Sequence, residues 1–274
     1  MKKIFKLRGR RQLEFGNKTL IMGILNFTPD SFSDGGKYFN RDAALVHAAQ
    51  LIEYGADILD IGAESTRPGA TPISADEELA RLKKILPAIK KFRVPISIDT
   101  YKPEVAAKVL KMGANLINDV HGLEDSRMID VAKEFKAPVI AMHSERCSDG
   151  DIIDDVKKFF RRTLENCAAK NFDTAKIIFD PGIGFGKTPE EDLMIMRRLD
   201  ELKIINGKEI FLMVGVSRKN FIGKITGLNL YDRDEATGAL CVHAIEKGID
   251  MVRVHNVKVV SRMCLMTDRL LRSA

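Results

Sequence analysis

One pattern recurs along this sequence: a short apolar run, a polar tip, and then a longer amphipathic segment. The runs are nearly continuous in Val, Ile, Leu and Met, which is typical of strands that are covered on both faces. There are eight such runs, at residues 19–25, 56–62, 94–99, 114–120, 137–143, 175–181, 209–217 and 250–255. Eight strands that alternate with helices predict an α/β fold, the TIM (β/α)8 barrel.

The segments between the runs carry helix signals. Residues 42–55 end in a glycine stop, and residues 75–91 open with acidic side chains, which a helix N-terminus favours. Residues 102–113 place a proline near the helix start and a glycine just past its end. A doubly wound open sheet is the structural alternative, but it usually carries a glycine fingerprint after its first strand, where this chain reads NFTPDSFSDGG.

The N-terminal stretch differs from the repeat that follows it. Residues 1–18 end at Gly16-Asn17, a hairpin-type turn signal, and predict a short antiparallel β-ribbon that closes the bottom of the barrel. No linker-like or low-complexity segment divides the chain. A length of 274 residues is normal for one barrel, so we expect residues 1–274 to form a single domain.

Cysteine use and hydropathy indicate the cellular setting. The four cysteines are scattered and form no CxxC motif, which favours free thiols in a reducing cytosol over disulfides or zinc. The basic N-terminus lacks the apolar core of a secretory signal, and no apolar run approaches the ~20 residues of a membrane helix. We therefore expect a cytoplasmic protein with no membrane partner.

The net charge of +6 raises the question of nucleic acid. Most lysines and arginines are interspersed with Asp and Glu, as in DEELARLKKILPAIKK, and this mixture is typical of solvated helix faces. A basic balance also suits an enzyme that attracts anionic substrates. Nucleic-acid binding is therefore the weaker interpretation.

Polar side chains stand at the end of nearly every predicted strand. Any one of them could cap the following helix, and Asp60 and Asp119 are candidates for that structural role. A lone His121 or His143 is more often part of a loop or core than a ligand. Seven polar residues nevertheless recur at equivalent places in six units, which favours joint use in an active site at the C-terminal face of the barrel. They are Asn26, Asp99, Asn118, Asp180, Lys219, Arg253 and His255.

These residue types suggest what such a site would bind. Asp99, Asn118 and Asp180 offer acceptors for the donor-rich edge of a flat nitrogen heterocycle, and Asp180 could accept two bonds from a guanidine-like edge. Lys219 supplies a donor for a ring carbonyl or nitrogen. Met142 and Phe185 could cover the ring faces, although both are also common core residues.

A second group of residues favours an anion. Arg67, Arg253 and His255 are cationic, and arginine suits bidentate contacts to phosphate. Asn26 provides a neutral oxygen ligand, which suits a hard ion such as Mg²⁺ better than zinc. One end of the predicted pocket therefore fits a heterocycle, and the other fits an anion with a metal.

Three glycine-rich segments lie near this predicted mouth. Residues 27–36 and 64–70 are rich in Gly, Pro, Ser and Asp and are interpreted as mobile active-site loops. Residues 182–188, GIGFGKT, lack the spacing of the GxxxxGK[ST] phosphate loop, so a nucleotide P-loop is not expected.

Taken together, the motifs resemble those of the dihydropteroate synthase family of the folate pathway. The resemblance extends from residue 22 to residue 257, and LNFTPDSFSDGG, ESTRPGA and SRKNFIG are specific as a set. It implies a TIM barrel, usually a homodimer, that joins 6-hydroxymethyl-7,8-dihydropterin diphosphate to 4-aminobenzoate and is the target of sulfonamides. The motifs that carry it are MGILNFTPDSFSDGG (22–36), GAESTRPGA (62–70), SIDTYKPEVA (97–106), INDV (117–120), DPGIGFGKT (180–188), VGVSRKNFIG (214–223) and RVHNV (253–257).

The resemblance also implies roles for individual residues. Asn26 is the expected Mg²⁺ ligand, and Asp34 the loop residue that stabilises a cationic pterin intermediate together with Asp99 and Asp180. The implied pterin pocket comprises Asp99, Asn118, Asp180 and Lys219, flanked by Met142 and Phe185. The implied diphosphate contacts are Thr66, Arg67, Arg253 and His255, and the implied aminobenzoate neighbours are Phe32, Pro68, Phe185 and Ser217.

The chain departs from the family pattern at three places. Ala63 replaces a glycine before the Glu-Ser-Thr motif, Asn256 stands where Asp is usual, and residues 144–151 form an atypical loop. The nearest alternative is a methyltetrahydrofolate-binding corrinoid methyltransferase, which would share the pterin pocket but would not need the cationic residues. A catalytically inactive barrel that serves as a binding partner is the second alternative, and loss of the charged set would indicate it.

Overall fold

A computed structural model describes residues 2–28, 41–65, 70–146 and 149–272. The described residues form a closed barrel of eight parallel strands in the order β11-β12-β3-β4-β5-β6-β7-β8, which confirms the predicted TIM barrel. Each predicted apolar run coincides with one of these strands, and only β3 extends past its run, by one residue. They are β3 (Leu20–Asn26), β4 (Ile58–Gly62), β5 (Ile96–Asp99), β6 (Leu116–Asp119), β7 (Val139–Met142), β8 (Ile177–Asp180), β11 (Phe211–Val214) and β12 (Met251–Val254).

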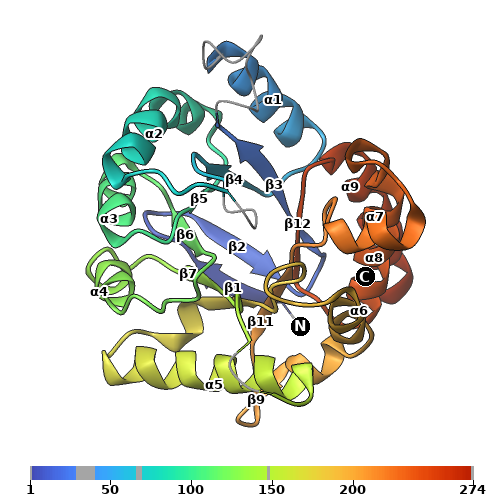
Figure 1. The fold of residues 1–274 in the computed structure, drawn as a ribbon. Coiled ribbons are helices and arrows are strands. Elements are labelled where there is room, and N and C mark those ends of the chain that lie inside the picture. Colours follow the sequence, from blue (N-terminus) through green and yellow to red (C-terminus); the bar gives the residue numbers. More distant parts are fainter. Residues whose placement is uncertain (1, 29–40, 66–69, 147–148, 273–274) are drawn as a thin grey trace.

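Helices surround the barrel in a ring (Figure 1). They are α1 (Arg41–Glu53), α2 (Ala75–Ile89), α3 (Pro103–Met112), α4 (Arg127–Glu134), α5 (Ile152–Ala169), α6 (Pro189–Arg197), α7 (Asn220–Thr226), α8 (Asp234–Glu246) and α9 (Val257–Leu271). Short 3-10 turns lie at Lys90–Phe92, Thr174–Lys176, Leu199–Leu202 and Leu230–Asp232, and a small hairpin pairs β9 (Ile204–Ile205) with β10 (Lys208–Glu209).

The sequence signals explain where the predicted helices begin and end. The Ser74 side chain accepts a hydrogen bond from the Glu77 backbone N–H and caps α2, whose first turn is acidic. Pro103 opens α3, and Gly113 ends it with a φ of 110°, a conformation that few residues other than glycine adopt readily. The three helices predicted from residues 42–55, 75–91 and 102–113 are therefore confirmed.

An antiparallel ribbon of β1 (Lys3–Lys6) and β2 (Gln12–Phe15) closes one end of the barrel, as predicted. Phe5 and Phe15 pack edge to face at 5.5 Å between ring centroids, and both contact the ring of Phe211. Burying a phenylalanine side chain contributes roughly 1.5–3 kcal/mol to the free energy of unfolding, so this cluster of three rings stabilises the end of the barrel. The ribbon's own turn contains Gly9, with a φ of 81°, and Gly16-Asn17 lies after the ribbon instead.

The inside of the barrel changes from apolar to polar along the strands. Side chains at alternate strand positions point inward, and those beside the ribbon are Met22, Ile58, Leu116, Ile140, Ile178, Met213 and Met251. Two residues further along the same strands stand Asp60, Asn118, Asp180 and Arg253. The apolar layer stabilises the barrel, and the polar layer lies at the C-terminal ends of its strands, where TIM-barrel active sites are built.

The described cysteines Cys167, Cys241 and Cys264 are buried and form no disulfide, in agreement with the expected free thiols. Burial raises the pKa of the Cys167 thiol to about 11, so it is not a reactive nucleophile. None of the helices in the described ranges combines the length and the hydropathy that crossing a bilayer requires.

A candidate active site at the C-terminal end of the barrel

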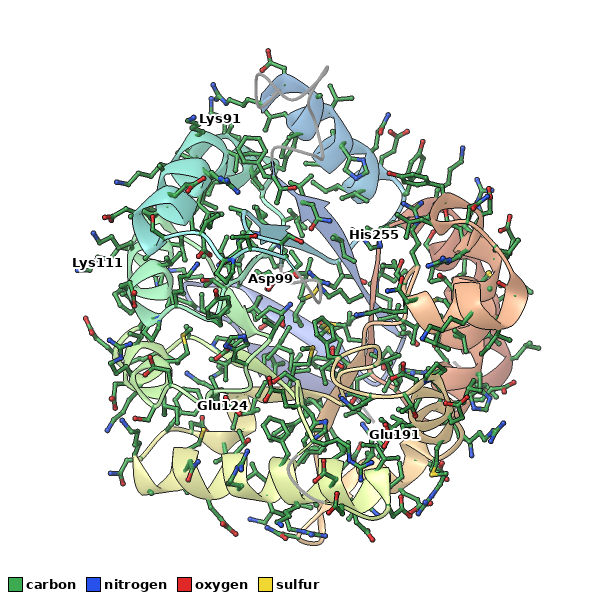
Figure 2. All side chains as sticks on the ribbon, viewed as in Figure 1. Lys91, Asp99, Lys111, Glu124, Glu191 and His255 are labelled. Atoms are coloured by element: carbon green, nitrogen blue, oxygen red, sulfur yellow. The ribbon has the colours of Figure 1, made fainter. Side chains whose placement is uncertain are left out.

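Strand register brings three of the predicted residues to one level. Asn26 pairs with Gly62, Gly62 with Asp99, and Asp99 with Asn118 across four adjacent strands. Asp99 lies near the centre of the ring of strands, whereas Lys91 and Lys111 lie at the outer edge of the molecule, with the surrounding helices (Figure 2). The register thus gathers polar side chains that are distant in sequence.

Gly62 leaves space between Asn26 and Asp99. A Cβ atom at this position would lie 3.6 Å from Asn26 Oδ1 and 3.7 Å from the Asp99 Cβ. No hydrogen bond of the Asn26 side chain is present within the described residues, and the buried Asp99 Oδ1 also lacks a partner there. The Asp99 oxygen nearest the same point is Oδ2, at 3.8 Å, so Asn26 Oδ1 and the Asp99 carboxylate border a common space at the barrel mouth.

One carboxylate oxygen of Asp180 accepts a hydrogen bond that stabilises a turn, and the other has no hydrogen bond to a described residue. Its Oδ1 accepts the Gly182 backbone N–H at 2.7 Å, which fixes the turn after β8. Its Oδ2 has no hydrogen bond to any described residue and faces Gly215, where a Cβ would be 3.7 Å away. Burial raises the pKa of Asp180, while the Gly182 N–H and the Lys219 ammonium oppose that rise.

Phe185 and Lys219 lie together at the same end. The Lys219 Nζ is 3.9 Å from the centroid of the Phe185 ring, a cation–π contact. Gly184 permits this approach, because a Cβ there would lie 2.9 Å from the Lys219 side chain. Phe185, predicted to cover the ring, and Lys219, the predicted donor, are therefore neighbours. Met142, the other residue predicted to cover the ring, is buried at the end of β7, where this strand pairs with Asp180 of β8.

The lysine predicts a pH dependence for ligand binding. Burial lowers the pKa of Lys219 to about 8, and the nearby Asp180 carboxylate opposes that shift. Lys219 is then charged below pH 8 and neutral above it, so affinity for a pterin that needs the ammonium falls as pH rises. At one pH unit above the pKa about a tenth of the lysines stay charged, so we expect the dissociation constant for pterin to increase severalfold between pH 7 and pH 9. Calorimetry between pH 7 and pH 9 measures this change in the dissociation constant. An equally steep loss of affinity in the Lys219→Met variant would contradict the role of Lys219.

Arg253 joins the two predicted zones of the pocket. Its Nε donates to Asp60 Oδ2 at 2.6 Å, and its Nη2 donates to Asp99 Oδ2 at 2.7 Å. Burial raises the pKa of Asp99 to about 7 against the lowering effect of Arg253. The predicted pterin acceptor and the predicted diphosphate cation are thus directly paired, although the sequence had suggested separate groups.

Ser217 and His255 form a second contact between neighbouring strand ends. Ser217 Oγ lies 2.9 Å from His255 Nδ1 and accepts the His255 backbone N–H at 3.1 Å. The predicted aminobenzoate neighbour therefore orients the predicted diphosphate contact.

Two aspartates interpreted as helix caps differ in the structure. Asp119 accepts the backbone N–H groups of His121 and Leu123, so it has a structural role, but in the turn after β6 and not as the cap of α4, which begins at Arg127. Asp60 caps no helix, and that interpretation is wrong: its side chain accepts from Asn118 and Arg253 instead. Sequence reasoning missed Asp60 as a site residue. The one signal for it was its position two residues before Gly62 on the same strand, which makes its side chain point into the barrel.

His143 is a buried core histidine, as the sequence suggested for a lone histidine. Its Nε2 lies 3.0 Å from Asp155 Oδ2, and burial lowers its pKa to about 4, so it is neutral at physiological pH.

Next to His143, the Lys187 ammonium donates to the carbonyl oxygens of His143, Gly182 and Phe185 at 2.9–3.0 Å. Residues 182–188 are therefore held by an inward lysine, in agreement with the absence of a nucleotide P-loop.

Five predicted site residues lie outside the described residues: Phe32, Asp34, Thr66, Arg67 and Pro68. Most of the predicted loops 27–36 and 64–70 lie there too.

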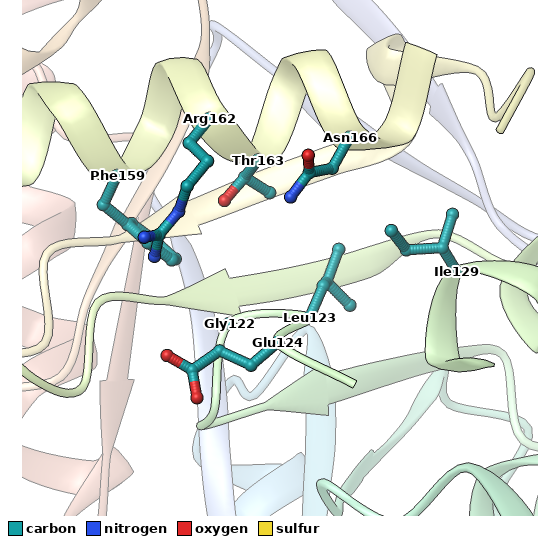
Figure 3. Close-up of a pocket in the computed structure, with 8 residues that line it drawn as sticks. All are labelled: Gly122, Leu123, Glu124, Ile129, Phe159, Arg162, Thr163 and Asn166. Carbon is teal, nitrogen blue, oxygen red and sulfur yellow. The ribbon is translucent and has the colours of Figure 1, made fainter. Parts of the chain in front are cut away.

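Two cavities lie outside the group formed by Asp99, Asn118 and Asp180. One, of about 300 Å³, is lined by Leu123 and Glu124 on one side and by Phe159, Arg162 and Asn166 of α5 on the other (Figure 3). The second, of about 340 Å³, is lined by Tyr101, Lys102, His121 and residues near the start of α4. Neither is lined by a predicted site residue.

Comparisons with known proteins find relatives that match most of the chain. A family model described as pterin binding enzyme matches residues 22–255. The chain is 45% identical over 263 residues to a dihydropteroate synthase of Bacillus subtilis, covering 94% of this chain and 91% of that protein. A Clostridium difficile dihydropteroate synthase structure, determined in the presence of pteroic acid, matches with a TM-score of 0.90, 42% identity, and coverage of 94% of this chain and 99% of that one. A Xanthomonas albilineans dihydropteroate synthase with 4-aminobenzoic acid matches with a TM-score of 0.92, 32% identity and coverage of 100% of both chains.

Proposed function

Because the chain belongs to the pterin binding enzyme family and, within it, to the dihydropteroate synthases, we propose that its barrel mouth joins 6-hydroxymethyl-7,8-dihydropterin diphosphate to 4-aminobenzoate. The chain is thus a transferase that forms 7,8-dihydropteroate and diphosphate. The observation that carries the site assignment is the buried row of Asp99 and Asn118 beside Asp180 and Lys219. We also propose that residues 1–274 form one pterin-binding domain.

In the proposed complex, acceptors hold the pterin by its donor-rich edge. Asp180 Oδ2 accepts from the guanidine-like edge, and Asn118 and Asp99 contact the remaining ring polar atoms. Lys219 donates to a ring carbonyl or nitrogen. Phe185, beside Lys219, and Met142 at the end of β7 flank the ring faces.

The reaction replaces one bond by another at the exocyclic CH₂ of the pterin. The bond from this carbon to the diphosphate oxygen breaks, and the electron pair leaves with the diphosphate, next to Arg253, His255, Thr66 and Arg67. The aminobenzoate nitrogen bonds to the same carbon and loses a proton. Asp99, Asp180 and Asp34 stabilise the positive charge on the pterin, and Pro68, Phe32 and Ser217 border the aminobenzoate. Sulfonamides would bind in place of aminobenzoate.

A divalent metal ion fits the residues at the end of β3, beside Asp99. The described residues hold no cluster of three or more His, Cys, Asp or Glu side chains that could bind a metal alone. Asn26 Oδ1 has no hydrogen bond to a described residue and faces the space beside Asp99. This suits Mg²⁺, because the ion is often held by few protein oxygens plus substrate phosphates and water. When bound, Mg²⁺ would stabilise the charge of the departing diphosphate.

Asn26→Ala is therefore expected to weaken Mg²⁺ binding specifically. We expect the Mg²⁺ concentration for half-maximal diphosphate release to rise by about tenfold or more, as is usual when a metal site loses a supporting group. Binding of 6-hydroxymethylpterin, which has no diphosphate, should stay at the wild-type affinity. An unchanged Mg²⁺ titration would argue against Asn26 as the ligand.

A homodimer in the cytoplasm is also proposed. Helix α9 exposes more than half of Leu265, Met266 and Leu270, an apolar surface that a second copy could cover. The three described cysteines, which are buried and form no disulfide, suit a reducing compartment. Sedimentation should give a dimer for the wild type and a smaller species for Leu270→Glu, whereas a wild-type monomer would exclude this assembly.

Diphosphate release tests the proposed function. Wild-type protein mixed with the pterin diphosphate, 4-aminobenzoate and Mg²⁺ should release diphosphate and form dihydropteroate in equal amounts. Omission of aminobenzoate should stop dihydropteroate formation. Pterin binding without any diphosphate release at saturating Mg²⁺ would instead be the behaviour of a pterin-binding methyltransferase module.

A further inference from the structure

Asp60 lies directly beneath the proposed pterin site. It is fully buried on β4 and points into the barrel two residues before Gly62. Its Oδ2 accepts the Asn118 side-chain N–H at 3.1 Å and the Arg253 Nε–H at 2.6 Å. One buried oxygen atom therefore contacts two residues that the proposed function assigns to the substrate.

We propose that Asp60 is a positioning residue, which orients Asn118 and Arg253 for the pterin diphosphate. This inference rests on the proposed function. A primary amide has a donor end and an acceptor end, and a carboxylate can only accept. Asp60 therefore holds the NH₂ end of Asn118, and the Asn118 Oδ1 is left to accept an N–H of the substrate.

The same carboxylate anchors Arg253. The guanidinium donates from Nε to Asp60 and from Nη2 to Asp99, which lies at the mouth. The fully buried Asp60 holds one side of the guanidinium, while the Nη2 side can exchange Asp99 for an oxygen of the diphosphate. Asp60 thus fixes where the cation stands before substrate arrives.

A capping role does not account for these contacts. Within the described residues, Asp60 accepts from these two side chains and from no backbone N–H, and its Oδ1 has no partner. Asp119, at the end of the next-but-one strand, shows the contrasting arrangement with two backbone donors. Burying a carboxylate is costly, so its retention beneath the site is consistent with a role in binding.

Two substitutions separate hydrogen bonding from packing. Asp60→Leu removes both acceptors at similar size, and we expect the dissociation constant for 6-hydroxymethylpterin to rise by about tenfold or more, since Asn118 and Arg253 each lose a buried acceptor. Asp60→Asn keeps one acceptor oxygen and should stay within about threefold of the wild type. The KM for 4-aminobenzoate at saturating pterin should be unchanged in both variants. Asp60→Ala has the same expectation as Asp60→Leu and replaces it if the leucine variant does not fold.

Asp268 offers a matched control at the other end of the barrel. It is also a buried carboxylate, bonded to the Thr19 backbone N–H at 2.7 Å and to Arg272 at 3.0 Å. Asp268→Leu should lower the melting temperature and leave the pterin dissociation constant unchanged. Wild-type pterin affinity in folded Asp60→Leu or Asp60→Ala, or an Asp60→Asn variant no better than leucine, would overturn the inference. Absence of pterin binding by the wild type would instead reject the proposed function.

Discussion

Asp180→Ala is expected to abolish measurable pterin binding while the protein remains folded. Asp180 has an oxygen without a hydrogen bond to the described residues, in a buried position where a ligand's donor would meet little competition from water. A carboxylate that accepts two N–H groups from a guanidine-like edge contributes about 3 kcal/mol, so the affinity should fall by about a hundredfold or more. Isothermal calorimetry with 6-hydroxymethylpterin measures this loss.

Asp173→Ala serves as the control for this experiment. Asp173 lies just before β8, at the opposite end of the strand from Asp180, and caps a 3-10 turn by accepting the Ala175 backbone N–H. Its loss should leave pterin affinity at the wild-type value. If Asp180→Ala also binds pterin as the wild type does, the assignment of the pocket is wrong.

Arg253→Ala is expected to cause the largest loss of stability. Removing the guanidinium leaves the buried Asp60 and Asp99 carboxylates side by side without their common cation. Breaking a buried pair in this way costs about 3–5 kcal/mol, and catalysis should be lost with it because the same cation is proposed to contact diphosphate. Urea denaturation measures the free energy of unfolding, and Arg127→Ala, which removes an exposed arginine paired with Asp125, should leave it unchanged.

Asp99 determines how the stability of the Arg253→Ala variant depends on pH. The pKa of Asp99 is already raised by burial to about 7, and Arg253 opposes that rise, so its removal raises the pKa further. The folded variant then holds a proton on Asp99 that the unfolded chain, with its ordinary carboxyl pKa, releases. Stability of the variant should therefore recover relative to the wild type as the pH falls below its raised pKa. A deficit that is equal at pH 5.5 and pH 8.5 would contradict this account of the pairing.

The barrel was predictable because its signals are local. Uninterrupted apolar runs identify parallel strands that are buried on both faces, and Pro103 and Gly113 mark the ends of a helix. The ribbon was also predictable, but its turn was not placed, because Gly9 and Gly16 both adopt positive φ and carry the same local signal.

The site was predictable in its members but less so in its contacts. Strand-end position indicated Asp99, Asn118 and Arg253, yet their connection through Asp60 joins residues 58 and 193 positions apart in sequence. Barrel closure and register create that proximity, and no single segment encodes it. Lys187 was likewise visible only as part of a glycine-rich motif, since its contacts to three carbonyl groups depend on the paths of two loops.

A crystal structure with bound 6-hydroxymethylpterin tests the central claim most directly. The ring should lie at the C-terminal end of the barrel, with the Asp180 carboxylate accepting from its guanidine-like edge and Asn118 Oδ1 accepting a ring N–H. Arg253 should keep its bond to Asp60. A pterin bound instead in the cavity beside α5, with Asp180 and Asn118 left uncontacted, would contradict the account.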